Sequence, residues 1–130
     1  MNFDLKERTV FLTLAGSRAF GFNEETSDWD YRGIAIPPTS SYIGLGGKFE
    51  QAVDDEKQKW IHSLFKDVVP NFGEFQIYEI TKFMRLALEN NLYILEILFS
   101  EDSSIFINHP ILKPIFDNRF KLLSKQARAR

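Results

Sequence analysis

The chain has 130 residues, 44% of them apolar, and its lack of cysteine excludes a disulfide scaffold, a thiol nucleophile and a Cys-ligated metal site. With 16 basic and 18 acidic residues the net charge is −2, which excludes wholesale electrostatic capture of nucleic acid, and the length fits one domain. Apolar runs stay below the ~18 residues of a membrane span and the start is charged, so we expect a cytoplasmic protein without a membrane partner.

The first part of the chain predicts strands separated by polar loops. Residues 9–14 are β-branched and apolar, which is typical of a buried strand. A second strand is predicted over residues 29–36, where alternation places Asp30 and Arg32 on the same face. Two prolines stop this strand, and residues 37–59 are predicted to form a long loop.

The second part of the chain changes from strands to helices. Residues 60–65 and 74–78 predict two further short strands. Over residues 77–88 the apolar spacing becomes that of one helix face, and the two asparagines that follow end this helix. A second helix is predicted over residues 92–99, and a third begins at Pro110.

This order of elements favours an α+β fold, namely a small mixed, mostly antiparallel sheet with helices packed on one face and further helices at the C-terminal end. We expect a core over residues 1–100 and a helical C-terminal segment over residues 101–130. The sequence ends inside a predicted helix, so we expect this segment to be truncated.

Two motifs on either side of a polar loop point to phosphate and metal chemistry. Asp28 and Asp30 are two residues apart on a predicted strand, so both carboxylates project from one face. Adjacent carboxylates repel each other unless a cation lies between them, and hard oxygen ligands suit Mg²⁺ or Mn²⁺. Upstream, Gly16 permits a close backbone approach to a phosphate, to which Ser17 offers a hydroxyl and an N–H.

This arrangement of Gly-Ser, ten residues and then Asp-x-Asp resembles the signature of the DNA polymerase beta-like nucleotidyltransferase superfamily. The longer segment, from residue 16 to residue 33, is similar to the sequences of a bacterial and phage branch of predicted nucleotidyltransferases, some of which are associated with RNA-repair operons. A second similarity covers Tyr78-Glu79-x-x-Lys82-Phe83 and the Leu-Glu-Ile-Leu-Phe run at residues 95–99. The branch's usual Asn-Pro is Asn91-Leu92 here, and the resemblance ends near residue 100.

The resemblance implies a third carboxylate on a later strand, just before the helix that carries Tyr78. Glu74 occupies that position, where Asp is commoner in the branch, and it shares a strand face with Gln76 and Tyr78. Asp67 is the alternative, because residues 65–69 can also form the third strand. Together with Asp28 and Asp30, the third acid completes the expected two-metal site.

The resemblance also assigns roles to several residues outside the carboxylates. Gly16 and Ser17 would hold the distal phosphates of a nucleoside triphosphate (NTP), and Arg18 or Arg32 would add a cation to them. For Arg32, a structural role as the internal salt-bridge partner of a carboxylate is an equally weighted alternative to phosphate binding. Lys82 is either a site residue or a solvated side chain on its helix.

The function implied is a Mg²⁺-dependent or Mn²⁺-dependent nucleotidyltransferase that moves a nucleoside monophosphate (NMP) from an NTP to a hydroxyl of RNA, a protein or a small molecule. Two metal ions would activate the acceptor hydroxyl and neutralise the leaving pyrophosphate. The alternative is a non-catalytic nucleotide-binding or antitoxin-like regulatory protein of the same fold, favoured by the Glu at position 74 and the short chain. A third possibility is a protein-interaction domain that uses exposed phenylalanines.

Overall fold

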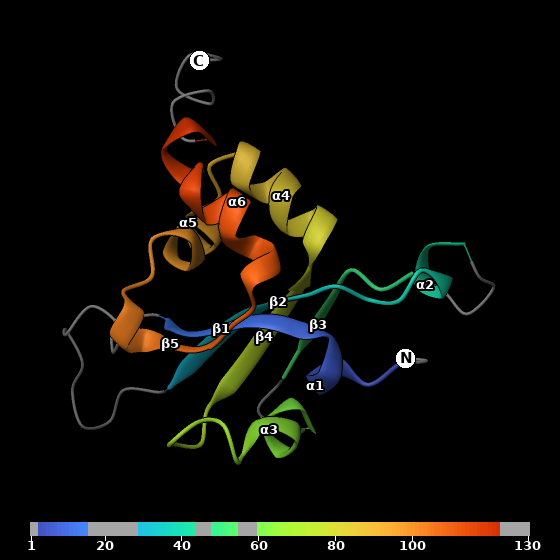
Figure 1. Ribbon diagram of the computed structural model, residues 1–130. Helices are drawn as coiled ribbons and strands as arrows, with labels where there is room; N and C mark the ends of the chain where they lie inside the picture. The colour runs from blue at the N-terminus through green and yellow to red at the C-terminus, as the bar shows by residue number, and fades with distance from the viewer. Residues whose placement is uncertain (1–2, 16–28, 44–47, 55–59, 123–130) are drawn as a thin grey trace.

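The computed structural model describes residues 3–15, 29–43, 48–54 and 60–122 (Figure 1). Its centre is a five-stranded sheet in the order β3-β4-β2-β1-β5. The β2–β4 pair is parallel and the other neighbours are antiparallel, which confirms the mixed, mostly antiparallel sheet of an α+β fold. The strands are β1 (Thr9–Ala15), β2 (Asp30–Ala35), β3 (Gln51–Val53), β4 (Glu74–Glu79) and β5 (Ile105–Asn108).

Helices pack on both faces of this sheet (Figure 1). The expected helical layer consists of α4, α5 and α6, and it covers the face on which Phe11, Ile34 and Tyr78 are buried. The opposite face, which buries Tyr31 and Phe75, is also covered, by the short helices α1 and α3. The helices are α1 (Leu5–Arg8), α2 (Ser40–Ile43), α3 (Trp60–Phe65), α4 (Ile80–Leu88), α5 (Leu92–Leu98) and α6 (Lys113–Asp117), with single 3-10 turns at Asp102–Ser104 and Pro110–Leu112.

The prediction of a strand over residues 60–65 is wrong, because this segment is helix α3. Ile61 and Phe65 are four residues apart, so one helix face buries both of them. The Asp54 carboxylate caps the helix by accepting hydrogen bonds from the N–H groups of Ile61 at 2.9 Å and His62 at 3.1 Å. The cap precedes Ile61 by seven residues, so no adjacent capping residue marks the helix start.

The long loop predicted over residues 37–59 is also interrupted by structure, because it contains α2 and the short edge strand β3. The strands predicted over residues 9–14 and 74–78 are confirmed, each one residue longer than expected. Residues 105–108, within the segment expected to be helical, form β5 and extend the sheet beside β1.

The junction between α4 and α5 is built by the two predicted asparagines. Asn90, two residues after the end of α4 at Leu88, adopts a left-handed backbone with φ 57°, a conformation that asparagine tolerates better than most residues. The Asn91 side chain then caps α5 by accepting from the N–H groups of Tyr93 at 3.0 Å and Ile94 at 3.3 Å. Leu92 follows at the first helical position, where proline is favoured, and this explains why an Asn-Pro pair also fits here.

Candidate functional site

Asp30 and Glu74 lie side by side at one end of the sheet. They are direct partners in the parallel β2–β4 pair, so their side chains project from the same face of two adjacent strands. On the other side of Asp30 lies Ala15, the last residue of β1. The row Ala15–Asp30–Glu74 therefore brings two expected carboxylates next to the point where the predicted Gly-Ser turn leaves β1.

A small hollow of about 100 Å³ opens beside these carboxylates. The next row of the same sheet face, Arg32 on β2 and Gln76 on β4, is paired in register in the same way. The sheet thus presents four polar side chains in a two-by-two array, with the acids at its end and an arginine and a glutamine behind them. The hollow is lined by Asp30, Tyr31, Arg32, Val53, Asp54, Glu74, Phe75 and Gln76.

Aromatic packing on the opposite sheet face fixes the strands that carry the acids. Tyr31, next to Asp30, stacks on Phe75, next to Glu74, with ring centroids 4.7 Å apart. Phe75 in turn stacks on Phe65 of α3 at 5.3 Å. Successive residues of a strand point to opposite faces, so the aromatic core on one face fixes the backbone positions of Asp30 and Glu74, whose side chains point to the other face.

A glycine allows the start of β4 to approach β2 this closely. A Cβ atom on Gly73 would lie 2.2 Å from the carbonyl oxygen of Trp29, which is far below a permissible contact. The same carbonyl accepts a hydrogen bond from the N–H of Glu74 at 3.0 Å. The Tyr31 hydroxyl also donates to the carbonyl of Asn71 at 2.8 Å and anchors the preceding turn.

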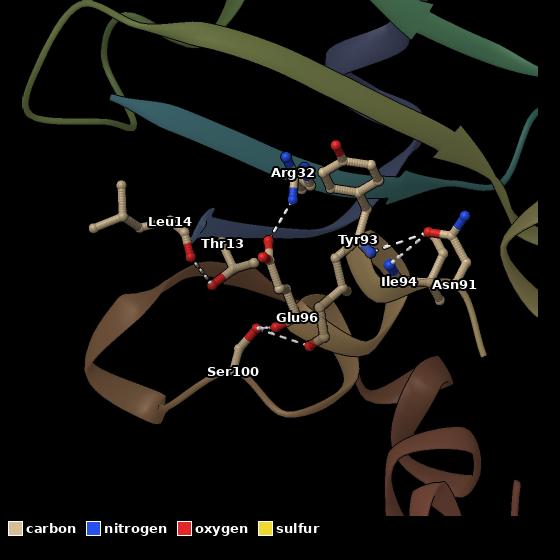
Figure 2. Close-up of polar contacts among 9 residues, drawn as sticks. Thr13, Leu14, Arg32, Asn91, Tyr93, Ile94, Glu96 and Ser100 are labelled. Atoms are coloured by element: carbon tan, nitrogen blue, oxygen red, sulfur yellow. Dashed lines mark hydrogen bonds and ion pairs between the residues drawn. The ribbon is translucent and has the colours of Figure 1, made fainter. Parts of the chain in front are cut away.

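Arg32 lines the hollow, and its guanidinium is held by α5. Its guanidinium donates to the Glu96 carboxylate, and its Cζ atom lies 4.4 Å from the centroid of the Tyr93 ring (Figure 2). The two charged side chains are 13% and 27% exposed, respectively. Burial raises the pKa of the nearby Tyr78 phenol, although the positive charge of Arg32 opposes this shift. Arg32, two residues after the Asp-x-Asp motif, is thus paired with the glutamate of the Leu-Glu-Ile-Leu-Phe run.

Lys82 lies toward the other end of β4. Its ammonium donates to the amide oxygen of Gln51 at 2.7 Å, and Gln51 pairs in register with Tyr78. This position is four residues along β4 from Glu74, or roughly 13 Å at the usual rise of a strand. The structure does not bring Lys82 together with the two acids.

Glu79 has a structural role at the junction of β4 and α4. Its buried carboxylate accepts hydrogen bonds from the Tyr42 hydroxyl at 2.6 Å, from the Thr81 hydroxyl and N–H, and from the N–H of Lys82. Burial alone raises the pKa of Glu79, but these hydrogen bonds stabilise the charged form and lower the pKa overall. Burial and the hydrogen bond to Glu79 raise the pKa of Tyr42. In the Tyr-Glu-x-x-Lys motif, the glutamate therefore serves as the N-terminal cap of α4.

Asp67, the alternative third acid, is not on a strand. It lies in the turn after α3, so the strand proposed for residues 65–69 is wrong. Its carboxylate forms an ion pair with Lys6 of α1 at 2.8 Å, and the hydrogen bond from Lys6 lowers the pKa of Asp67. Both helices belong to the sheet face opposite Glu74.

Four of the predicted site residues, namely Gly16, Ser17, Arg18 and Asp28, lie outside the described residues. Within the described ranges no group of three or more His, Asp or Glu side chains is arranged to hold a metal ion. Among those residues, Asp30 and Glu74 are therefore two candidate ligands without a third beside them. No helix among the described residues is long and apolar enough to cross a membrane.

Sequence reasoning missed two contributors to this end of the sheet. One is Gly73, to which the sequence analysis assigns no role, although a glycine directly before a strand is a signal for close backbone approach. The other is Glu96, which belongs to the helical motif; its pairing with Arg32 spans 64 residues, and the sequence carries no local signal for it.

A family model described as RlaP, the RNA repair pathway DNA polymerase beta family, matches residues 3–109. Because this match covers most of the chain, the chain belongs to that family, which confirms the resemblance and indicates a nucleotidyltransferase-type function. Comparisons with curated proteins and with solved structures gave no match.

Proposed function

We propose that this member of the RNA repair pathway DNA polymerase beta family is a metal-dependent nucleotidyltransferase that moves an NMP from an NTP to an acceptor hydroxyl. The observation that carries this proposal is the pairing of Asp30 with Glu74 on one sheet face, beside the last residue of β1. The family description favours RNA as the acceptor, with a protein or small-molecule hydroxyl as the alternatives.

The described carboxylates fit a divalent cation. Asp30 and Glu74 project from adjacent strands, about 5 Å apart, and two like charges at that separation favour a cation between them. Asp54 also lines the hollow, but its two oxygens accept hydrogen bonds from α3, so we assign it a structural role. Asp30 and Glu74 would hold Mg²⁺ or Mn²⁺, with Asp28 as the third ligand expected from the sequence.

The chain's own residues would act mainly by positioning. When bound, the metal would supply positive charge for the hydroxyl and for the leaving pyrophosphate. The acceptor oxygen forms a bond to the α-phosphorus while the bond to the bridging oxygen breaks, and the hydroxyl proton passes to solvent. Asp30 and Glu74 would fix the reacting atoms, and Gly16 and Ser17 would hold the phosphates after β1.

The size of the hollow limits what the described residues can enclose. At about 100 Å³ it is smaller than the ~300–1,000 Å³ typical of a small-molecule site. It would therefore take the reacting end of a nucleotide.

A second candidate function is nucleotide binding without transfer. The observation that favours it is the pairing of Arg32 with Glu96, which compensates one of the two cations expected to assist phosphate binding. Such a protein would bind NTP in the presence of Mg²⁺ and transfer nothing.

The test is incubation of the full chain with NTPs carrying a labelled α-phosphate, Mg²⁺ and cell lysate, followed by separation of RNA, protein and solutes. We expect label on RNA, a loss of at least a hundredfold in Asp30→Asn and in Glu74→Gln, and no loss in Asp67→Asn, the matched acid on the other sheet face. Binding of NTP without transfer would support the second candidate. No transfer together with no Mg²⁺-dependent NTP binding, measured by calorimetry, would contradict both.

A further inference from the structure

The row of polar residues behind the acids carries little net charge. Arg32 is the only cation among the described residues that line the hollow, and the Glu96 carboxylate already compensates it. Tyr93 covers the guanidinium on another side, with its ring centroid 4.4 Å from Cζ. An oxyanion placed here would have to compete with Glu96 for Arg32. The charge balance therefore disfavours a triphosphate at this row.

Gln76 is the second member of this row. It is half-buried, it lines the hollow, and it pairs in register with Arg32. In the part of the chain that the structure describes, the side-chain amide of Gln76 makes no hydrogen bond. A glutamine amide offers both donors and an acceptor, which matches a pair of hydroxyl groups rather than an anion.

The distance between the rows fits the geometry of a nucleotide. Gln76 lies two residues along β4 from Glu74, or roughly 7 Å at the usual rise of a strand. If the reacting α-phosphate is held at the acids, the group that lies one short step away along the nucleotide is the sugar with its two hydroxyls. The neutral row can hydrogen-bond this group without a charge mismatch.

We infer that Gln76, beside the Glu96-neutralised Arg32, is a positioning residue that binds the ribose hydroxyls of the nucleotide and makes the site prefer ribonucleotides. This inference rests on the proposed function and adds the substrate class to it. A site that hydrogen-bonds a substrate hydroxyl discriminates against the analogue that lacks it, because its own polar group is then left unpaired.

The experiment compares Mg²⁺-dependent binding of ATP, GTP, CTP and UTP with that of the four 2′-deoxynucleotides, by calorimetry on the full chain. We expect the wild type to prefer the ribonucleotide of its best base by about five- to tenfold. Gln76→Leu should reduce this ratio to about one, and it should weaken deoxynucleotide binding less than ribonucleotide binding, because a deoxynucleotide loses only its contact through the 3′-hydroxyl. Gln76→Asn, which keeps a shorter amide, should retain part of the preference.

Asn108→Leu on the edge strand β5 is the matched control, because it replaces an exposed amide on the same sheet far from the hollow. It should keep the wild-type ratio, and thermal unfolding checks that every variant is folded. An unchanged ratio in Gln76→Leu, or no ribonucleotide preference in the wild type, overturns the inference while NTP binding leaves the proposed function standing. A wild type that binds no NTP overturns both.

Discussion

The N–H of Glu74 donates a hydrogen bond to the carbonyl oxygen of Trp29 at 3.0 Å, and this contact brings the first residue of β4 next to Asp30. A backbone contact of this kind is insensitive to the glutamate side chain but depends on the residue before it. Gly73 leaves the room for it, so the spacing of the two acids is set by a residue that carries no functional group.

Replacing that glycine should therefore affect both stability and the site. In Gly73→Ala the new methyl would lie 2.2 Å from the Trp29 carbonyl oxygen, and β4 must move away from β2. We expect a loss of about 1–3 kcal/mol in the free energy of unfolding, measured by urea titration, and a loss of Mg²⁺-dependent NTP binding. Gly33→Ala also creates a clash, at 2.5 Å from the carbonyl of Phe11, but away from the acids. Gly33→Ala should therefore lose stability but keep more of its Mg²⁺-dependent NTP affinity than Gly73→Ala. If the two variants lose NTP affinity in the same proportion to their loss in the free energy of unfolding, this role for Gly73 is contradicted.

The ion pair between Arg32 and Glu96 should couple β2 to α5. Glu96→Gln leaves a largely buried guanidinium without its counter-charge, and we expect a loss of about 1.5–3 kcal/mol. The double variant Arg32→Met with Glu96→Leu should recover part of this loss, because it removes both charges together. The coupling energy is measured by urea unfolding of a double-mutant cycle that consists of the wild type, Arg32→Met, Glu96→Leu and the double variant. A coupling energy below about 0.3 kcal/mol would show that the two side chains act independently.

The Glu79 cap should make stability depend on pH in a defined direction. The folded-state pKa of Glu79 is lowered below its usual value of 4.5, so its contribution is present above that pH and is lost as the pH falls through the folded-state value. Glu79→Gln should cost about 1–2 kcal/mol at pH 7 and progressively less at pH 4 and below. Taking the difference between variant and wild type cancels the similar contribution of Asp67. A cost that stays constant from pH 7 to pH 3 would contradict the assignment.

Mg²⁺ alone should stabilise the folded chain through the two acids. At a concentration ten times its dissociation constant, a cation bound only to the folded state adds about 1.4 kcal/mol, which raises Tm by about 5 °C for a chain of this size. Asp30→Asn and Glu74→Gln should abolish the rise, and Asp67→Asn should keep it. A rise that survives both site variants would place the cation elsewhere.

Leu92 should accept a proline. It occupies the first helical position of α5, and Asn91 before it has φ −62° and ψ 125°, the extended conformation that a following proline requires. Leu92→Pro should raise the free energy of unfolding by about 0.4–1 kcal/mol, because it restricts the unfolded chain. Leu92→Ala provides the control for loss of the exposed leucine side chain. Destabilisation by proline relative to alanine would contradict this reading of the helix start.

The strands and the shared face of Asp30 and Arg32 were predictable because they depend on local alternation. The β2–β4 pairing was not, since it is a parallel contact between distant segments, and the preference for Glu74 over Asp67 came from the resemblance rather than from periodicity. Helix α3 was missed because Asp54, which caps it, is not adjacent to the helix start. The positions of Gly16, Ser17, Arg18 and Asp28 stay predictions.

The place of β4 between β2 and β3 has a consequence for biosynthesis. β1 and β2 can pair as soon as both have left the ribosome, but the hydrogen-bonding edge of β2 then stays open until β4 emerges about 40 residues later. An open, apolar strand edge recruits other nascent chains. Slowing translation between these two segments should therefore increase aggregation of the newly made protein, and the acidic end of the sheet can form only after β4 has emerged.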